Sequence, residues 1–389
     1  MPLADVVVVG AGVTGASTAF QLARRNAGRI ILVERDTVGS GPTARTIGIV
    51  RLHYSYEPLI RLAVRGLEVF TDFQTLTGAT ADFTRTGFLL LATAAQLPAV
   101  EENVSLQQRL GVRTSILSPT ELARLDPRMH LADVAGGAYE PDAGYADGYA
   151  TAAGFASAAR RLGVEIWEGT RAERLLISGG VMRGLGTSRG TIETPRVLVA
   201  AGPQTPALLA TAGIIVPIQA ARQQVVHLDP PGAFGRLGVV IEDMTQGFYA
   251  RPESHRSVLA GVLEEEAEQI VPADGFNQGV DFEFMRRVGA LWAHRYPQAA
   301  DAGVRGGYAS VYDITPDWQP VLGAVDGVDG LYLAAGFSGH GFKLAPALGE
   351  CLAALLTGQR PGIDIAPFAL SRFAAGRLIR GRHAQGILG

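Results

Sequence analysis

The sequence predicts an α/β protein with a second domain that is rich in antiparallel β-sheet, and three patterns support this fold class. A strand–helix–strand unit begins close to residue 1, and two later strands each end in Ala-Ala-Gly, at Gly202 and Gly336. From about 219 to 312 the pattern changes to alternating strands. A chain of 389 residues is also too long for one simple core, so we expect two closely packed domains.

The first unit combines a β-branched strand at 6–9, an apolar-periodic helix at 15–25 and a buried strand at 30–33. Farther along, Ser118-Pro-Thr-Glu121 is a capping box that predicts the start of a short helix. The other expected helices are 56–76, 120–125, 149–162, 282–296 and 345–356, and the expected strands are 87–91, 164–167, 171–178, 197–202, 224–228, 238–242, 248–252, 257–262 and 331–336.

The composition excludes several classes of function. Apolar residues make up 47% and charged residues 18%, which is typical of a globular protein with a large interior. A net charge of −3 gives no electrostatic reason to bind nucleic acid or an anionic membrane surface. Cys351 is the single cysteine, so no intrachain disulfide can form. With no basic leader and no apolar run of ~20 residues, we expect a cytoplasmic protein.

Gly10-Ala-Gly12-Val-Thr-Gly15 is a glycine fingerprint placed between a strand and a helix. Gly10 permits the tight turn, and Gly12 lets the backbone approach a pyrophosphate at the helix N-terminus. Gly15 allows the helix to pack closely on the strand. Glu34, about 20 residues further on at the end of the second strand, can accept a hydrogen bond from a ribose hydroxyl. Together they predict a Rossmann-type dinucleotide-binding domain.

The fingerprint itself does not distinguish NAD from FAD. The Ala-Ala-Gly strands at Gly202 and Gly336 are expected to extend the same sheet toward the far end of a long cofactor. No second fingerprint is present for a nicotinamide, since Gly179-Gly180 fits an ordinary turn. These observations favour FAD, and a flavoprotein without a nicotinamide site takes its electrons from the substrate. An NAD dehydrogenase remains the alternative, which a yellow purified protein would exclude.

Lys343 is the only lysine of the chain and lies in the glycine-rich turn Gly336–Lys343, between an apolar strand and an apolar helix. A genome that favours arginine codons explains the general bias toward arginine. It does not explain the position of the one lysine, and a compact ammonium cannot be exchanged for a guanidinium in a tight site. We therefore interpret Lys343 as a functional cation, with an ordinary surface lysine as the alternative.

The segment Thr315-Pro-Asp317, the strand 331–336 and the string Gly336-Phe-Ser-Gly-His-Gly-Phe-Lys343 resemble one C-terminal signature. It is that of the D-amino-acid-oxidase-like FAD-dependent amine oxidoreductases, and monomeric sarcosine oxidase is the closest type. The resemblance covers essentially the whole chain. It implies a Rossmann-type FAD domain from 1–85, 146–218 and 316–389, and a discontinuous antiparallel β-sheet-rich substrate domain from 86–145 and 219–315.

The implied activity is oxidation of the C–N bond of a small secondary amino acid such as sarcosine. In sarcosine oxidases two cations hold the substrate carboxylate, and Lys343 and Arg51 match them. Tyr249 and Tyr312 match aromatic pocket positions, and His340 is expected beside the flavin in a positioning or electrostatic role; a buried structural role remains open for these three residues. The implied cofactor-binding residues are Gly10, Gly12, Val13, Thr14, Gly15, Glu34, Arg35, Thr43, Ala44, Ala172, Gly202, Gly339, Gly341, Phe342 and Lys343.

Three positions depart from the family pattern. Ser310 and Arg45 stand where relatives tether their flavin through cysteine or histidine, so we expect non-covalent FAD. The lysine that activates dioxygen in sarcosine oxidase aligns with Leu259, which leaves two acceptors open, dioxygen or an electron-acceptor protein. No side chain stands out as a general base, and no metal site is expected. The alternative functions are an amino-acid dehydrogenase subunit of proline, glycine or dimethylglycine type and a redox-silent flavoprotein.

Overall fold

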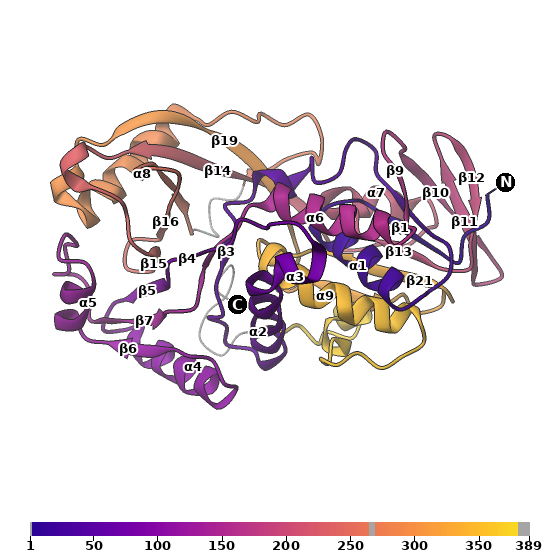
Figure 1. Ribbon diagram of the computed structural model, residues 1–389, viewed down its shortest axis with the longest axis horizontal. Helices are drawn as coiled ribbons and strands as arrows, with labels where there is room; N and C mark the ends of the chain where they lie inside the picture. Colours follow the sequence, from indigo (N-terminus) through magenta and orange to yellow (C-terminus); the bar gives the residue numbers. More distant parts are fainter. Residues whose placement is uncertain (1, 264–268, 380–389) are drawn as a thin grey trace.

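The computed structural model describes residues 2–263 and 269–379, and two large sheets occupy separate halves of this part of the chain (Figure 1). The first, which we call the parallel sheet, has the strand order β20-β21-β13-β1-β2-β9, with only β20 antiparallel. The two expected Ala-Ala-Gly strands are β13 and β21; β13 pairs with β1, and β21 pairs with β13. The strands are β1 Val6–Val9, β2 Ile30–Val33, β9 Glu165–Trp167, β13 Val197–Val199, β20 Val321–Ala324 and β21 Leu331–Ala335.

The parallel sheet is covered on both faces. On one face the side chains of Val6 and Val8 pack in a core with the helices α1 (Val13–Arg24), α6 (Gly148–Arg161) and α9 (Gly341–Leu356). On the other face, Val7 and Val9 pack with a small antiparallel sheet. Burial on both faces explains the uninterrupted valine run of β1. The small sheet consists of β10 Ala172–Ser178, β11 Val181–Thr187 and β12 Gly190–Glu193.

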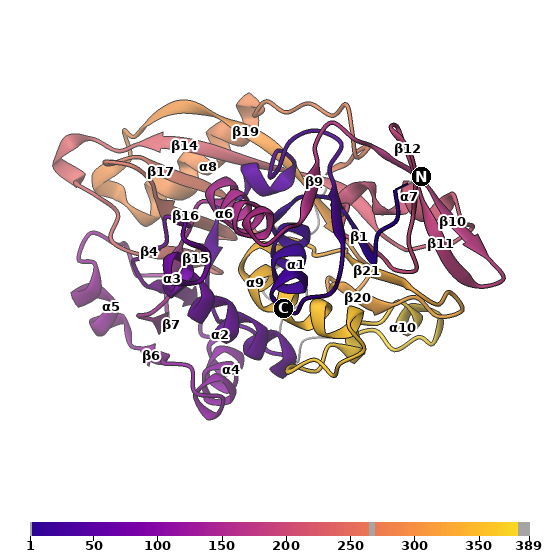
Figure 2. The same cartoon turned by 45° about the vertical axis from the view of Figure 1, so that its right-hand side comes forward.

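The second large sheet, which we call the mixed sheet, has the order β18-β14-β17-β16-β15-β5-β7-β6, and β19 pairs with β14. β5 and β15 lie parallel and join the two chain segments that build this half. The helix α8 (Phe282–Arg295) packs on the mixed sheet next to β14, β17 and β19 (Figure 2). The strands are β5 Phe88–Ala92, β6 Ser115–Leu117, β7 Gly136–Glu140, β14 Gln219–Asp229, β15 Val240–Asp243, β16 Phe248–Pro252, β17 Val258–Val262, β18 Gln269–Ile270 and β19 Gly303–Ile314.

Two expected helices differ in the structure. The helix expected at 56–76 is two helices, because the chain leaves helical geometry at Asp72, with φ −103° and ψ 18°. α9 begins at Gly341 and not at 345, so Lys343 lies in its first turn. In the turn before α9, Gly336, Ser338 and Gly339 all have positive φ. These conformations make the turn short, so the helix can begin at Gly341.

The capping box at Ser118 is confirmed, with both reciprocal hydrogen bonds present. Sequence patterns did not predict β19, whose first half, Gly303-Val-Arg-Gly-Gly307, lacks the composition of a strand. No helix within the described ranges is long and apolar enough to cross a membrane. The remaining elements are β3 Ile49–Val50, β4 Thr84–Arg85, β8 Gly144–Tyr145, α2 Glu57–Thr71, α3 Phe73–Thr77, α4 Leu97–Arg109, α5 Pro119–Leu125, α7 Thr205–Ala210 and α10 Ser371–Ala374, with 3₁₀ turns at Pro42–Arg45, Gly202–Gln204, Gly232–Phe234, Pro297–Ala299 and Ala366–Phe368.

Candidate active site

A cavity of about 590 Å³ is lined by residues of both halves. Its wall includes most of the residues that the sequence predicted, namely Gly10, Gly12, Val13, Thr14, Glu34, Arg35, Thr43, Arg51, Ala172, Gly202, Tyr249, Tyr312, Gly339, Gly341, Phe342 and Lys343. Three predicted residues, Gly15, Ala44 and His340, do not form part of this wall in the described chain. The structure therefore brings the fingerprint and the proposed substrate residues to one cavity.

The fingerprint glycines make room where the backbone is crowded. Gly10 has φ +98°, and a Cβ on it would collide with the carbonyl oxygen of Ala200 at the end of β13. A Cβ on Gly15 would collide with the carbonyl oxygen of Gly10, so this glycine serves the packing of α1 on β1 and lies off the wall. At the start of α1, the Val13 N–H donates to Thr43 Oγ1 over 3.2 Å. The N-terminus of α1 faces the cavity as the fingerprint predicts.

Glu34 is fixed at the end of β2 by two backbone hydrogen bonds. Its Oε2 accepts from the N–H of Ala11 over 2.8 Å, and its Oε1 accepts from the N–H of Asp36 over 3.0 Å. The carboxylate therefore braces the fingerprint loop and still forms part of the cavity wall. An anion-binding helix N-terminus next to a rigid acceptor fits the pyrophosphate and ribose of a dinucleotide such as FAD.

Arg51 enters the cavity as a cation that is already paired. Its Nε donates to Glu242 Oε1 over 3.0 Å, and the two side chains are 1% and 7% exposed. Its Nη1 donates to the carbonyl oxygen of His53. The guanidinium also lies over the Tyr54 ring, 4.7 Å from the ring centroid. Because Arg51 follows β3 and Glu242 belongs to β15, this ion pair ties the small β3-β8-β4 sheet to the mixed sheet.

Lys343 is held in place through its backbone. The first turn of α9 lies so close to α2 that a Cβ on Gly66 would collide with the Lys343 carbonyl oxygen. The side chain lines the cavity and is buried. The pKa of Lys343 is lowered to about 7, first by burial and then by the Arg51 guanidinium, while the Glu242 carboxylate raises it. An anionic ligand would restore the charge of this ammonium.

A second carboxyl group, that of Glu140 in β7, is completely buried near Arg51. Its Oε2 accepts from the N–H of Leu52 over 2.8 Å, and its Oε1 has no partner among the described residues. Burial raises the pKa of Glu140 to about 8, although the Leu52 hydrogen bond and the Arg51 charge lower it. Glu140 is therefore protonated at neutral pH, and the carboxylate that pairs with Arg51 is Glu242.

His340 lies behind the cavity wall. It is completely buried, and its Nδ1 is 3.3 Å from the Tyr54 hydroxyl. Tyr54 in turn carries the Arg51 guanidinium on its ring. The pKa of the neighbouring His53 is lowered to about 3 by burial and by Arg51, so His53 is neutral. His340 thus contacts the residue on whose ring the Arg51 guanidinium lies.

Two tyrosines shape the cavity wall. The Tyr249 hydroxyl packs on Gly261 of β17, where a Cβ would collide with it, and the Tyr312 ring packs on Gly339. Burial raises the pKa of Tyr249 well above its usual value, so its hydroxyl stays protonated. Leu259, matched to the oxygen-activating lysine, lies in β17 and is absent from the wall formed by the described residues.

Sequence reasoning missed Glu242 and Glu140. It also found no side chain that stands out as a general base, whereas the structure places a buried carboxylate in the cavity. A signal was present for Glu242, because an acid at the end of the buried run Val239-Val-Ile-Glu242 is costly to bury without a purpose or a partner. Its partner, Arg51, is distant in the sequence, so only the fold reveals the pair.

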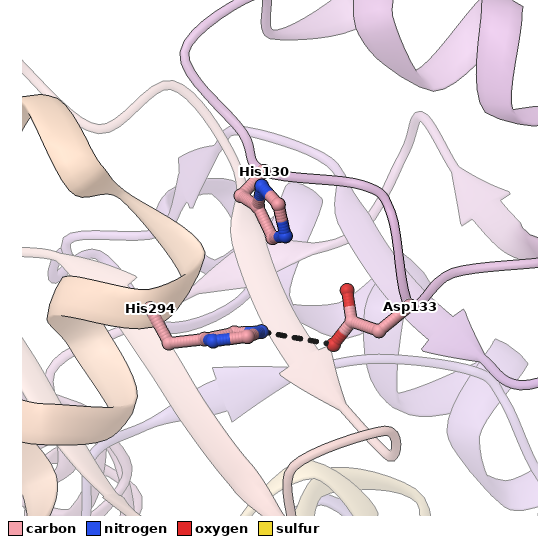
Figure 3. A group of neighbouring side chains, drawn as sticks. All are labelled: His130, Asp133 and His294. Carbon is pink, nitrogen blue, oxygen red and sulfur yellow. Dashed lines mark hydrogen bonds and ion pairs between the residues drawn. The ribbon is translucent and has the colours of Figure 1, made fainter.

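A second group of titratable side chains lies on the surface of the mixed-sheet half and consists of His130, Asp133 and His294 (Figure 3). His294 Nε2 is 3.2 Å from Asp133 Oδ2. Both oxygens of Asp133 also accept from Arg295, each over 3.0 Å, and Arg295 binds the buried Asp243 over 2.8 Å. His294 and Arg295 of α8 thus both bind Asp133, and Arg295 also ties α8 to Asp243 of β15.

Comparison with known proteins identifies the family of this chain. The family profile described as DAO, FAD dependent oxidoreductase, matches residues 5–355. The 4-methylaminobutanoate oxidase (formaldehyde-forming) of Paenarthrobacter nicotinovorans is 30% identical over 376 residues, which cover 95% of this chain and 45% of that protein. The chain thus spans less than half the length of this relative. Sarcosine oxidase subunit beta of Rhodobacter capsulatus is 25% identical, with 98% and 92% of the two chains covered.

Among solved structures, L-proline dehydrogenase from P. horikoshii superposes with a TM-score of 0.90 at 27% identity, with 97% of this chain and all of that chain (100%) covered. The shared architecture includes the parallel sheet that carries the fingerprint loop. The family profile spans this loop, the mixed sheet and most of α9, and the cavity wall fits a dinucleotide. The chain therefore belongs to the DAO family of FAD dependent oxidoreductases.

Proposed function

We propose that this protein oxidises the C–N bond of a small secondary amino acid such as sarcosine, with FAD as the cofactor. One observation carries the proposal: the buried basic residue Lys343 and the Arg51–Glu242 ion pair line the same cavity. The fingerprint loop lines this cavity too. Such a site suits a small molecule with both an acidic and a basic group. The names of relatives, 4-methylaminobutanoate oxidase and sarcosine oxidase subunit beta, support the same substrate class.

The roles of the chain's own residues follow from their positions. Lys343 binds the substrate carboxylate, and Arg51 adds positive charge to the same end of the cavity. Tyr249 and Tyr312 enclose the substrate and exclude water. Val13 and Thr14 at the N-terminus of α1 hold the pyrophosphate, and FAD, when bound, supplies the acceptor for the two electrons that leave the substrate. In this proposal, 1–85, 146–218 and 316–389 form the FAD domain, and the other segments form the substrate domain.

Non-covalent binding of FAD is part of the proposal. Ser310 and Arg45 line the cavity at the positions matched to tethering residues, and neither can form the thioether or histidyl bond. Cys351, the one cysteine, is buried in α9 and lies off the wall formed by the described residues. Acid precipitation should therefore leave all of the flavin in the supernatant. Yellow colour that stays with the pellet would contradict this part of the proposal.

A dehydrogenase is the second candidate. The likeness to L-proline dehydrogenase favours it, and so does the absence of any lysine besides Lys343 that could activate dioxygen. In that case an electron-acceptor protein, and not dioxygen, reoxidises the flavin. Both candidates fit a cytoplasmic enzyme, since the single cysteine suits a reducing compartment.

The test is the visible spectrum of the purified yellow protein during anaerobic addition of sarcosine, followed by air. Bleaching that reverses rapidly in air establishes an oxidase. Bleaching that persists establishes a dehydrogenase that lacks its acceptor. If neither sarcosine nor any of a panel of N-alkyl and cyclic amino acids bleaches the flavin, amine oxidation is overturned in favour of a redox-silent flavoprotein.

A further inference from the structure

Glu242 faces the cavity because of its register in β15. Its neighbour Asp243 points to the opposite face of the mixed sheet, where it binds Arg295. The side chains of adjacent strand residues alternate between the two faces, so Glu242 lies on the cavity side, opposite Tyr249 of β16. The strand therefore presents one carboxylate to α8 and one to the proposed substrate.

Of the two carboxylate oxygens of Glu242, only Oε1 has a hydrogen-bond partner among the described residues. Oε1 accepts from Arg51 Nε over 3.0 Å, whereas the buried Oε2 has no hydrogen-bond partner among the described residues. A buried carboxylate oxygen without a partner is unfavourable, and such groups in native structures mark a missing ligand or a functional role. Because Glu242 is part of the cavity wall, a ligand in the cavity can supply the missing donor.

The charges near Glu242 define which donor fits. Lys343 and Arg51 are the basic side chains of the cavity wall near Glu242, and a substrate carboxylate restores the charge of Lys343; Glu140, also near Arg51, is held protonated by its burial. Glu242 is the carboxylate that pairs with Arg51, and an acceptor without hydrogens favours an ammonium or amine N–H. The three charges together match the two ends of an amino-acid zwitterion.

We propose that Glu242 is the specificity-determining residue that receives the substrate amino group, with Oε2 accepting an N–H of the amine. The inference rests on the proposed function, since it names the residue that recognises the amine of that substrate. It requires that the substrate carry at least one hydrogen on nitrogen. An ether oxygen at the same position would meet the Oε2 lone pairs and be rejected.

The Glu242→Gln variant tests the proposal by reversing the polarity of this hydrogen bond. Arg51 Nε can only donate, so it orients the new amide with its oxygen toward Arg51 and its NH₂ group at the former Oε2 position. The variant thus offers a donor where the native protein offers an acceptor. It keeps the shape of the side chain and its contact with Arg51.

Two matched ligand pairs would be measured by anaerobic calorimetry with dithionite-reduced holoenzyme, which cannot oxidise them. The pairs are sarcosine with methoxyacetate and L-proline with tetrahydrofuran-2-carboxylate, in which oxygen replaces N–H. For the pair that binds, the native protein should bind the amine more tightly than the ether. Glu242→Gln should weaken binding of the amine at least tenfold and strengthen binding of the ether at least threefold. Glu283→Gln, which changes an exposed acid of α8, should leave both affinities unaltered.

The outcomes separate the inference from the proposed function. If the amine binds and Glu242→Gln leaves the amine-to-ether preference within threefold of the native value, the role of Glu242 is overturned and the proposed function stands. If neither amine binds the native protein, the inference is overturned, and the panel of N-alkyl and cyclic amino acids decides whether the proposed function fails with it. Flavin absorbance per protein and circular dichroism of each variant report that the fold and cofactor are retained.

Discussion

Arg51 Nε and Glu242 Oε1 form a buried ion pair with a separation of 3.0 Å, between two residues that are 191 positions apart in the sequence. The pair changes the meaning of the two-cation clamp expected from the family resemblance. Glu242 already balances part of the positive charge of Arg51. We therefore expect a substrate carboxylate to interact more strongly with Lys343 than with Arg51. The second oxygen of Glu242, a residue of the cavity wall, is buried and has no hydrogen-bond partner among the described residues.

Removal of Arg51 should destabilise the protein more than removal of the whole pair. Arg51→Met leaves the Glu242 charge buried without its cation, at a cost of about 3–5 kcal/mol. The double variant Arg51→Met/Glu242→Gln removes both charges and should lose at least ~1 kcal/mol less than the sum of the single variants. Urea unfolding of the holoenzymes gives the coupling free energy, and additive single effects would contradict a buried pair.

Lys343→Met should lower kcat/KM by a factor of at least roughly 30 to 150, which corresponds to ~2–3 kcal/mol of transition-state stabilisation. The substitution removes the cation that pairs with the substrate carboxylate in a desolvated site. Methionine keeps the length of the side chain and removes the charge. Flavin reduction in single turnover is the measurement, with flavin content as the control for folding. A change of less than threefold would end the assignment of Lys343 to the carboxylate.

Lys343 should also make carboxylate binding depend on pH. Its pKa of about 7 in the free protein, lowered by burial and by Arg51, means that the ammonium is charged below pH 7 and neutral above it. The Kd of propionate should be constant below pH 7 and rise about tenfold per pH unit above it, as binding then requires uptake of a proton. Lys343→Met should flatten this profile, whereas an ordinary lysine would keep the native profile flat to pH 9.

Glu140 should make stability fall as pH rises. Its pKa is about 8 in the folded protein and about 4.5 when unfolded, so the folded state binds more protons between these values. The contribution is fully present below pH 4.5 and is lost as pH rises through 8, by at most about 1.4 kcal/mol per unit. Glu140→Gln keeps an acceptor for the Leu52 N–H. As pH rises from 5 to 8, the free energy of unfolding in urea should become larger for this variant than for the native protein. Parallel profiles would refute a raised pKa.

The sequence by itself determined the nucleotide half. The fingerprint depends on Gly10, Gly12 and Gly15, whose roles follow from local steric needs, and the buried valine run of β1 has few other interpretations. The position of Lys343 beside the cavity also followed from a local string of residues. These features are local in the chain, and local patterns are what sequence reasoning detects well.

The tertiary structure alone decided how the charges combine. Glu242, Glu140 and Arg51 come from β15, from β7 and from just after β3, and no spacing in the sequence relates them. Only the structure shows that His340 contacts the Tyr54 hydroxyl and that Lys343 belongs to α9. Burial sets the pKa values of these groups and long-range packing sets their partners, so the chemistry of the site depends on contacts that exist only after folding.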